Sequence, residues 1–431
     1  MKELNKIATT IEEKLEKENV IKFAYTITDN KKEEFTAQNG EFSLLRTVFS
    51  SVFSLTVFVD ERVGTKVGND LTEEGIEKTI KEAVEAASSS DKDSAYDIAG
   101  KEEDIKANRG DTDLSNEVFF SRFKELLLTV KENYPLIHIM DTVGEHVHYN
   151  SLYKNSNGTT EETTGGLFSF YIGFSAHENG EGTGMNHSGF STKTLDKPFI
   201  ELGAIKSDLE SSVKSLKKAQ IKEKFTGDLI FTPGCFSSFV QFLLENISNK
   251  AILDGTSTWK DKLDMAVADE KLTIMLKSSD ERIVDGELLT SDGFKTEDVP
   301  IIENGILKNF IINLYTANKT GKKPTKNTSS DLVVYSGNSS LEEMIKSTEK
   351  GLLIGGFSGG EPSVNGDFSG VAKNSFLIEN GEITGAVSET MINGNLMEMV
   401  KNIKAISKEY VADGDYVMPY AKVAEIVISS K

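Results

Sequence analysis

The N-terminal quarter of the chain alternates between helical and extended hydrophobic patterns. Apolar side chains recur at three- and four-residue intervals in residues 4–15 and 76–87, which predicts two amphipathic helices. Alternating apolar and polar positions predict short strands between them, at residues 21–28, 34–37, 41–48 and 55–59. Asn39-Gly40 predicts a hairpin turn, because both residues tolerate positive φ. We therefore expect residues 1–100 to form an N-terminal α+β domain.

The next segment starts polar and then follows a strand pattern between two helices. Residues 88–113 are rich in Ser, Asp and Lys and are the best candidate for a linker. Helical spacing covers residues 115–131 and 206–219, and several strands separated by Gly-rich turns are predicted within residues 136–191. We expect residues 101–222 to form a middle region of helix and β-meander.

The C-terminal half contains one hairpin motif twice. Residues 300–310 read PIIENGILKNF and residues 375–386 read SFLIENGEITGA, each an apolar run, a Glu-Asn-Gly turn and a second apolar run. Helices fit residues 341–347 and 396–406. Hairpins and helices without β-α-β alternation predict an α+β fold: an N-terminal α/β region, then a large antiparallel sheet or barrel with packed helices. Residues 223–431 would form this C-terminal β-rich domain.

The composition indicates which kinds of molecule the chain is suited to bind and in which compartment it folds. The chain has 48 Lys and Arg against 68 Asp and Glu, a formal net charge of −20, which disfavours direct nucleic-acid binding. A single cysteine excludes an internal disulfide framework and is typical of a reducing compartment. No apolar run resembles a signal peptide or a membrane span, so we expect a soluble, cytoplasmic protein that does not bind membranes.

The single cysteine, Cys235, starts a predicted helix in residues 232–248, TPGCFSSFVQFLLENIS. Thr232 is a plausible N-cap and Pro233 fits the first helical position. A thiol at a helix N-terminus can become a nucleophile, but it also needs a base, and all five histidines lie between residues 138 and 187. We therefore interpret Cys235 as a buried structural thiol.

Histidines provide one possible metal site. His146 and His148 lie two residues apart on one strand face, a spacing that can hold zinc, and His138 or His187 could supply a third ligand. The same pattern also arises on a solvated polar strand face, which we favour. The Gly-rich residues 355–360 lack the Lys-Ser/Thr of a phosphate-binding loop. Composition and spacing alone therefore define no catalytic constellation.

Several C-terminal motifs together resemble a known family. The motifs are VNGDFSG at residues 364–370, LIENGEI at 377–383 and INGNL at 392–396, with SDGFKT at 291–296 and IENGIL at 302–307 upstream. They resemble the signature of the TldD/PmbA family, often labelled modulators of DNA gyrase. Residues 57–87 resemble the family's first region, so the resemblance covers nearly the whole chain.

The resemblance implies which half of the family this chain joins. TldD-like members are zinc metallopeptidases with an H-E-x-x-x-H helix and a cysteine ligand near the C-terminus, whereas PmbA-like (TldE) members lack these ligands. Here the corresponding segment, residues 240–245, reads VQFLLE, no histidine follows His187, and residues 407–427 contain no cysteine. On the basis of this resemblance we assign no catalytic, cofactor-binding or metal-binding residue to this chain. We expect zinc only in a TldD-like partner.

The resemblance also implies a function. We expect a non-catalytic, PmbA-like subunit of a heteromeric zinc metallopeptidase that acts on unfolded or extended peptides, and a homodimer when the chain is alone. Whether this chain is itself an enzyme stays open. One alternative is a stand-alone zinc enzyme that uses His146 and His148. Another is a gyrase-associated regulator, which rests on the family label and on an acidic surface that would suit DNA mimicry.

Overall fold

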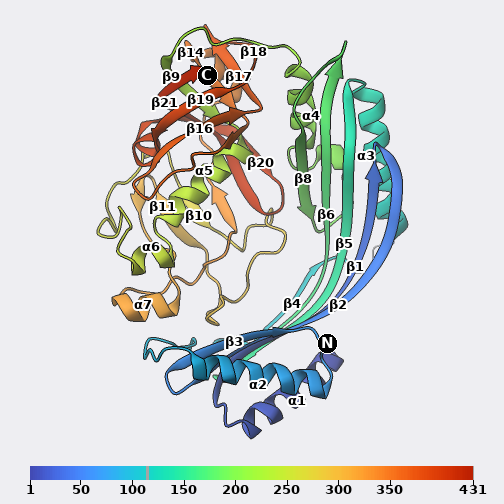
Figure 1. Cartoon of the computed structure of the whole chain (residues 1–431), viewed down its shortest axis with the longest axis vertical. Helices are drawn as coiled ribbons and strands as arrows, with labels where there is room; N and C mark the ends of the chain where they lie inside the picture. The colour runs from blue at the N-terminus through green and yellow to red at the C-terminus, as the bar shows by residue number, and fades with distance from the viewer. Residues whose placement is uncertain (113–115, 431) are drawn as a thin grey trace.

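A long, curved N-terminal sheet faces a β-rich C-terminal body (Figure 1). The structure is a computed structural model that describes residues 1–112 and 116–430. No helix in these ranges is both long and apolar enough to cross a membrane. The mixture of strands and helices confirms the predicted α+β class.

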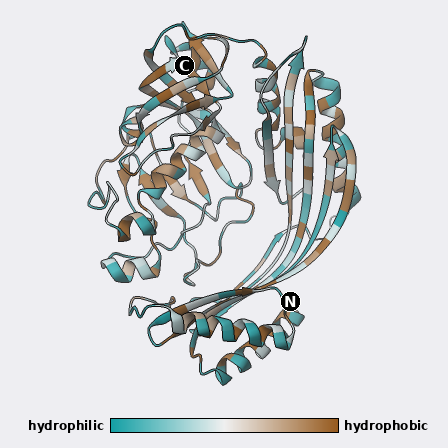
Figure 2. Ribbon diagram, viewed as in Figure 1, coloured by the Kyte–Doolittle hydropathy of each residue, from teal (hydrophilic) through white to brown (hydrophobic). Residues whose placement is uncertain are grey.

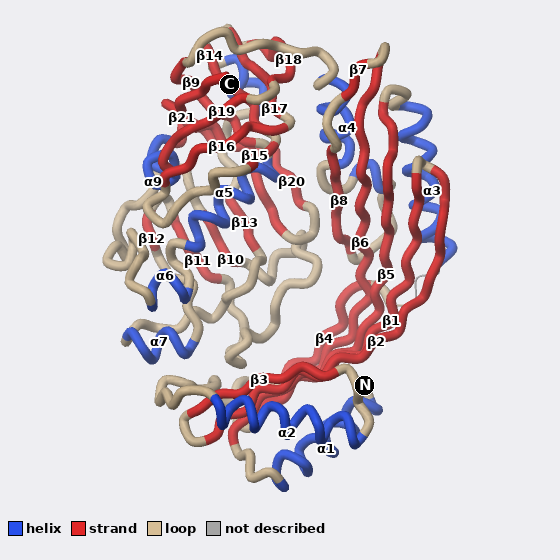
Figure 3. Tube along the Cα trace, in the orientation of Figure 1, coloured by secondary structure: helices blue, strands red, loops and turns tan. Residues whose placement is uncertain are grey.

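The N-terminal sheet has the strand order β3-β2-β1-β5-β6-β4, and β7 and β8 pair with β6. Its strands are β1 (Lys22–Gln38), β2 (Glu41–Val59), β3 (Arg62–Gly68), β4 (Ile105–Gly110), β5 (Ile137–Asn155), β6 (Thr160–Glu178), β7 (Glu181–Gly182) and β8 (Asn186–Thr192). Asn39 and Gly40 have φ of 52° and 75° in the β1–β2 turn, as predicted. The four long strands run without a break from one end of the sheet to the other (Figure 3).

Two helix layers cover the sheet and explain why β1 looked like two short strands. Helices α1 (Lys2–Lys17) and α2 (Glu73–Ser89) cover one end of the convex face, where Ile27 is buried. Helix α3 (Asn116–Asn133) covers the other end, where Phe35 is buried, and α4 (Ile205–Lys214) lies beside β8. Residues 29–34 lie in the gap between the two helix layers and are all polar. The alternating hydrophobic pattern is therefore interrupted there, although the strand continues. Brown and teal positions therefore alternate along the long strands (Figure 2).

The C-terminal body is built around one large apolar cluster. Within the described part of the chain its sheet contains 13 strands: β9 (Phe225–Phe231), β10 (Ile274–Leu276), β11 (Val299–Glu303), β12 (Ile306–Leu307), β13 (Leu332–Val334), β14 (Lys350–Ile354), β15 (Gly356–Ser358), β16 (Asp367–Lys373), β17 (Ser375–Glu379), β18 (Glu382–Val387), β19 (Thr390–Asn395), β20 (Ile403–Ala412) and β21 (Tyr416–Ser430). Its helical segments are α5 (Pro233–Glu245), α6 (Asn249–Leu253), α7 (Leu314–Thr320), α8 (Leu341–Lys346), α9 (Leu396–Met399) and the 3-10 turn η2 (Val400–Asn402).

Both predicted Glu-Asn-Gly hairpins are present, as β11–β12 and β17–β18. Their turn residues adopt positive φ, 48° at Asn304 and 51° at Asn380, and the glycine after each does the same. This is the conformation that Asn and Gly reach at least cost.

Three sequence predictions differ from the structure. The expected helix at residues 396–406 ends early, because Ile403 begins β20 and pairs with β21 instead. The expected helix at residues 206–219 ends at Lys214. The expected linker contains β4, which pairs in parallel with β6.

The predicted boundary at residue 100 falls within one continuous sheet, because β1 pairs directly with β5. The division into residues 1–100, 101–222 and 223–431 stays a prediction about folding units.

Candidate functional site

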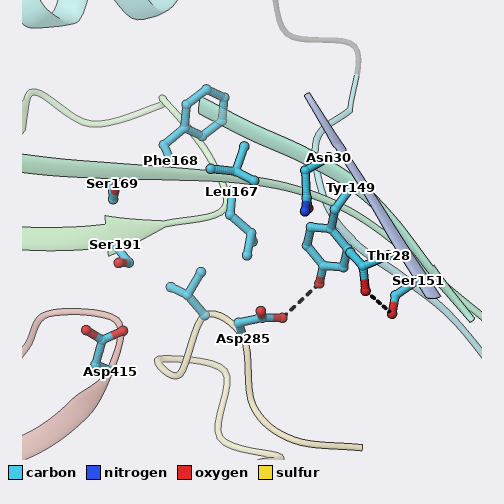
Figure 4. A pocket seen from close by; sticks show the side chains of 12 residues that line it. Thr28, Asn30, Tyr149, Ser151, Leu167, Phe168, Ser169, Ser191, Asp285 and Asp415 are labelled. Atoms are coloured by element: carbon cyan, nitrogen blue, oxygen red, sulfur yellow. Dashed lines mark hydrogen bonds between the residues drawn. The ribbon is translucent and has the colours of Figure 1, made fainter. Parts of the chain in front are cut away.

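A cleft separates the concave face of the N-terminal sheet from the C-terminal body. One cavity in it has a volume of about 470 Å³ and is shown in Figure 4. Because side chains alternate between the faces of a strand, Val147, Tyr149 and Ser151 of β5 all point into the cavity. A larger cavity of about 990 Å³ continues between β8, α4 and the N-terminus of α5.

The segment that follows α2 contacts the C-terminal body directly. The Asp93 carboxylate accepts hydrogen bonds from the Tyr315 hydroxyl at 3.0 Å and from Lys319 Nζ at 2.9 Å. Asn318 Nδ2 donates to the carbonyl of Ala95 at 2.9 Å. These contacts join the presumed linker to α7, so the segment holds the two bodies together.

Within the cavity, the two bodies meet at Asp285. Its carboxylate accepts a 2.9 Å hydrogen bond from the Tyr149 hydroxyl and lies 3.1 Å from Arg109 Nη1 (Figure 4 draws the tyrosine contact). Burial and the neighbouring Asp285 charge raise the pKa of Tyr149, so its hydroxyl stays a donor at neutral pH. Arg109 belongs to β4, the strand within the expected linker.

Helix α5 forms the opposite wall of the larger cavity. It begins where Thr232 leaves β9 in an extended conformation and Pro233 occupies the first turn, as the sequence predicted. Gly234 and Ser238 are the exposed positions that line the cavity, while Phe236 on the other side of the helix is buried. The helix therefore presents small, uncharged side chains to the cleft.

Cys235 contributes to this wall, but its side chain is only 3 % exposed and packs in the C-terminal core. Burial raises the pKa of the Cys235 thiol, which opposes formation of a thiolate. The geometry agrees with the interpretation of a structural thiol.

Carboxylates dominate the charge of the cleft. Asp413 and Asp415, in the turn between β20 and β21, both have pKa values raised by burial. Burial likewise raises the pKa of Asp208 on α4 to about 6. The cavity is also lined by Lys214 and Lys373, which offset part of this charge. A wall of this kind favours cationic or hydrogen-bond-donating ligands over anionic ones.

The histidines considered as zinc ligands lie on opposite faces of the sheet. His146 and His148 share the convex face, because they alternate with Val147 and Tyr149 in the cleft. A register shift at Met140 places His138 opposite Ser175, on the concave face, and His187 lies opposite Gly173 on that face. The structure therefore does not bring His138 or His187 together with the other two.

The expectation of a solvated strand face is wrong for His146. Its ring is 5 % exposed, stacks on Phe168 at 4.3 Å between centroids, and has Nδ1 3.7 Å from a Glu33 carboxylate oxygen. Burial lowers the pKa of His146 although Glu33 opposes the shift. Val147, on the other face of β5, lines the cleft.

Residues 240–245, the segment that the family resemblance aligns with the zinc motif, lie in α5. Val240 and Leu243 pack in the core, whereas Gln241 faces a cavity of about 430 Å³ that Asp331 also lines. Across residues 1–112 and 116–430, no group of three or more His, Cys, Asp or Glu side chains is arranged to hold a metal ion.

Sequence reasoning missed the residues that define the cleft. The sequence singles out neither Asp285, which pairs with Glu281 in a spacing common in so acidic a chain, nor Asp413 and Asp415. The one available signal was the turn Asp413-Gly414-Asp415 between two apolar runs near the C-terminus.

Comparison with protein families matches most of the C-terminal body and part of the N-terminal sheet. Residues 225–430 match the model described as the PmbA/TldA metallopeptidase C-terminal domain, and residues 26–87 match the model of PmbA/TldA metallopeptidase domain 1.

Curated relatives are similar along most of their length. The chain is 24 % identical to a metalloprotease of Methanocaldococcus jannaschii, with 87 % of each chain covered. It is also 24 % identical to the metalloprotease PmbA of Escherichia coli O157:H7, with 89 % of this chain and 88 % of the relative covered.

Solved structures share the fold. TldE from Thermococcus kodakarensis superposes with a TM-score of 0.85 at 19 % identity, covering 98 % of this chain and 100 % of that chain. A proposed modulator of DNA gyrase from Bacteroides thetaiotaomicron gives a TM-score of 0.86 at 22 % identity, with both chains fully covered.

Proposed function

Because this chain belongs to the PmbA/TldD metallopeptidase family, we propose that it is the non-catalytic, PmbA-like subunit of a two-subunit zinc peptidase. Its curated relatives are metalloproteases, which supports a role in proteolysis. In the proposal, zinc and the hydrolytic step belong to a TldD-like partner, and this chain completes the enclosure that binds the peptide.

One observation carries the proposal. Helix α5, which the family resemblance aligns with the zinc-binding helix, borders the cleft, but its exposed positions there are Gly234, Ser238 and Gln241, and its only thiol, Cys235, is buried. These positions leave room for a ligand, and Ser238 and Gln241 offer hydrogen bonds, yet none of the three can hold Zn²⁺ in the way that imidazole or thiolate does.

The cleft suits an extended peptide better than a compact small molecule. It runs between a sheet face and a helix N-terminus, and the larger cavity alone measures about 990 Å³. Asp208 and Asp415 favour a peptide amino group or basic side chains, and the polar Ser169 and Ser191 lie on neighbouring strands of the sheet. Peptides that are already unfolded fit such a cleft, whereas folded domains do not.

Reconstitution with the TldD-like subunit of the same organism tests the proposal. We expect peptide hydrolysis only when both chains are present, and substantially less than one zinc per chain when this chain is purified alone without chelator. Replacing both His146 and His148 by Ala should leave partner-dependent hydrolysis intact. Stoichiometric zinc in the isolated chain that disappears in the double variant would overturn the proposal.

A cleft variant tests the role of this chain in peptide binding. Ser238→Trp fills the larger cavity from an exposed position of α5, so kcat/KM of the two-subunit enzyme should fall at least about tenfold. Ser121→Trp is the matched control, because Ser121 is also an exposed helical serine but lies on α3, away from the cleft. Equal activity of the two variants would contradict binding in this cleft.

A further inference from the structure

The Asp415 side chain lies where three cavities of the cleft meet. It lines the cavities of about 470 and 990 Å³ and also the cavity of about 430 Å³ beside Gln241. In Figure 4 its carboxylate points toward Ser191, on the sheet side of the cleft. Since open space continues from Asp415 into each of the three cavities, this residue marks the middle of the cleft and not one of its ends.

No positive charge compensates the Asp415 carboxylate within the described part of the chain. Its oxygens accept no hydrogen bond and form no ion pair there. Burial raises the pKa of Asp415, and the charges of Asp413, Asp331 and Asp285 raise it further. An ionised Asp415 is therefore stabilised by any cation that enters the cleft beside it.

The larger cavity as a whole is suited to a cation. Among the described residues, its carboxylates outnumber its lysines: the carboxylates are Asp208, Glu210, Asp413 and Asp415, and the lysines are Lys214 and Lys373. Lys214 already has a partner, because its Nζ lies 4.0 Å from an oxygen of Glu210. Burial raises the pKa of the Tyr416 hydroxyl, and Asp413, Asp208 and Asp415 act in the same direction, so three carboxylates surround this phenol.

A buried hydroxyl in the same cavity indicates, independently of the carboxylates, that a polar ligand binds there. Ser188 is only 5 % exposed, and its Oγ has no hydrogen-bond partner among the described residues. It lies near enough to Asp208 to oppose the rise in the pKa of that carboxyl, but makes no hydrogen bond with it. A buried polar atom without a partner costs free energy, which a ligand that bonds to it would recover.

We propose that this chain selects peptide segments that carry a lysine or arginine side chain, and that Asp415 determines this specificity. The inference rests on the proposed function, because it names the substrate class of the same cleft. The cationic group would lie against Asp415, and the ring of Phe357, which lines the larger cavity, can cover the methylene groups of a long basic side chain.

The position of Asp415 favours a basic side chain over a free peptide amino terminus. A peptide that ended at Asp415 would use only part of the cleft, whereas the cavities continue beyond this residue. A side chain can reach Asp415 while the peptide continues in both directions.

Peptide binding by the purified full chain tests the inference without requiring hydrolysis. The probe is an unstructured, N-acetylated nonapeptide with a central lysine and a fluorescent label at its C-terminus. Fluorescence anisotropy should show that it binds at least about tenfold more tightly than the same peptide with norleucine, which keeps the methylene chain but lacks the ammonium group. Leaving the amino terminus of the norleucine peptide free should not restore binding.

An isosteric variant tests the role of Asp415. Asp415→Asn should reduce the preference for lysine over norleucine to less than about threefold. Asp261→Asn, at an exposed carboxylate outside the cleft, is the matched control and should retain the full preference. Because each variant removes one of the 68 acidic side chains, both lose the same share of the general attraction between an acidic protein and a basic peptide.

The outcomes separate this inference from the proposed function. Equal binding of the lysine and norleucine peptides by the native chain, including failure of both to bind, would overturn the inference. So would rescue of the norleucine peptide by a free amino terminus, or a full lysine preference in Asp415→Asn. Failure of the proposed function appears elsewhere, as absence of hydrolysis of any peptide when this chain is combined with the TldD-like subunit.

Discussion

The Tyr149 hydroxyl and the Asp285 carboxylate are separated by 136 residues in the chain and are joined by a 2.9 Å hydrogen bond across the cleft. Tyr149 comes from the concave face of the N-terminal sheet and Asp285 from a loop of the C-terminal body (Figure 4). The contact, with Arg109 on the same carboxylate, fixes how far apart the two walls stand. The width of the cleft therefore depends on a short polar cluster.

Removing the shared acceptor should loosen the two bodies. In Asp285→Ala, Tyr149 and the largely buried Arg109 lose their partner together, so we expect the free energy of unfolding to fall by about 1–2 kcal/mol, a range that allows for the partial exposure of Asp285. Urea titration measures this change, and hydrogen exchange in residues 105–110 should become faster. Asp261→Ala, at an exposed carboxylate outside the cleft, is the control. An unchanged free energy would show that this cluster does not hold the bodies together.

Glu287 should make the protein less stable as the pH rises. Burial, with the Asp331 charge as the second cause, raises the pKa of Glu287 from 4.5 to about 7. The folded state therefore binds this proton more tightly than the unfolded state, and its stabilising effect is complete below pH 4.5 and lost as the pH rises through about 7. Glu287→Gln mimics the protonated form, so it should match the native chain at pH 4.5 and exceed its free energy of unfolding at pH 8 by about 1–2 kcal/mol.

The control for Glu287→Gln is the same replacement at a carboxylate that is not buried. Glu303→Gln, at the exposed end of β11, is the matched replacement against which the effect of Glu287→Gln is measured at both pH values. A Glu287→Gln chain that is less stable than the native chain at pH 8 would mean that the carboxylate is held ionised by a partner.

Local features of the fold could be predicted from the sequence because they depend on neighbouring residues. Asn39-Gly40 and Asn380-Gly381 fix their turns through their own φ preferences, and Thr232-Pro233 fixes the start of α5. The length of β1 could not be predicted, because its polar middle reflects a gap between helix layers that only tertiary structure creates.

The candidate site was less predictable for the same reason. Whether His146 faces solvent or the core depends on the register of β5 against its neighbours, and the shift at Met140 reverses the faces for His138. Asp285 gains significance only because folding places it beside Tyr149. A carboxylate in an acidic sequence carries no such information by itself.

Cys235 should be unreactive until the protein unfolds. Its thiol is buried in the C-terminal core and burial raises its pKa, so both access and thiolate formation are opposed. We expect labelling by 5,5′-dithiobis(2-nitrobenzoate) to be at least about a hundredfold slower in buffer than in 6 M guanidinium chloride. Cys235→Ala should retain partner-dependent peptide hydrolysis and lose about 1 kcal/mol of stability. Rapid labelling of the folded chain, or loss of hydrolysis in a folded Cys235→Ala chain, would restore the nucleophile hypothesis.

His146 should make the protein less stable in mild acid. Burial lowers the pKa of His146 in the folded state, so below the ordinary value of about 6.5 the unfolded chain binds this proton and the folded chain resists it. Stability contributed by the neutral ring is therefore present above pH 6.5 and lost as the pH falls. In His146→Gln, the fall in free energy of unfolding between pH 7.5 and 5.5 should be smaller than in the native chain by up to about 1 kcal/mol.

An exposed histidine separates this effect from general acid sensitivity. His177→Gln, at an exposed position near the end of β6, is the matched histidine replacement against which the flattening in His146→Gln is measured. Because the His146 ring stacks on Phe168 and its Nε2 has no hydrogen-bond partner among the residues that the structure describes, the ring acts as a packing group. If adding Zn²⁺ raised the melting temperature of the native chain and not that of His146→Gln, the ring would have to be reassigned as a ligand.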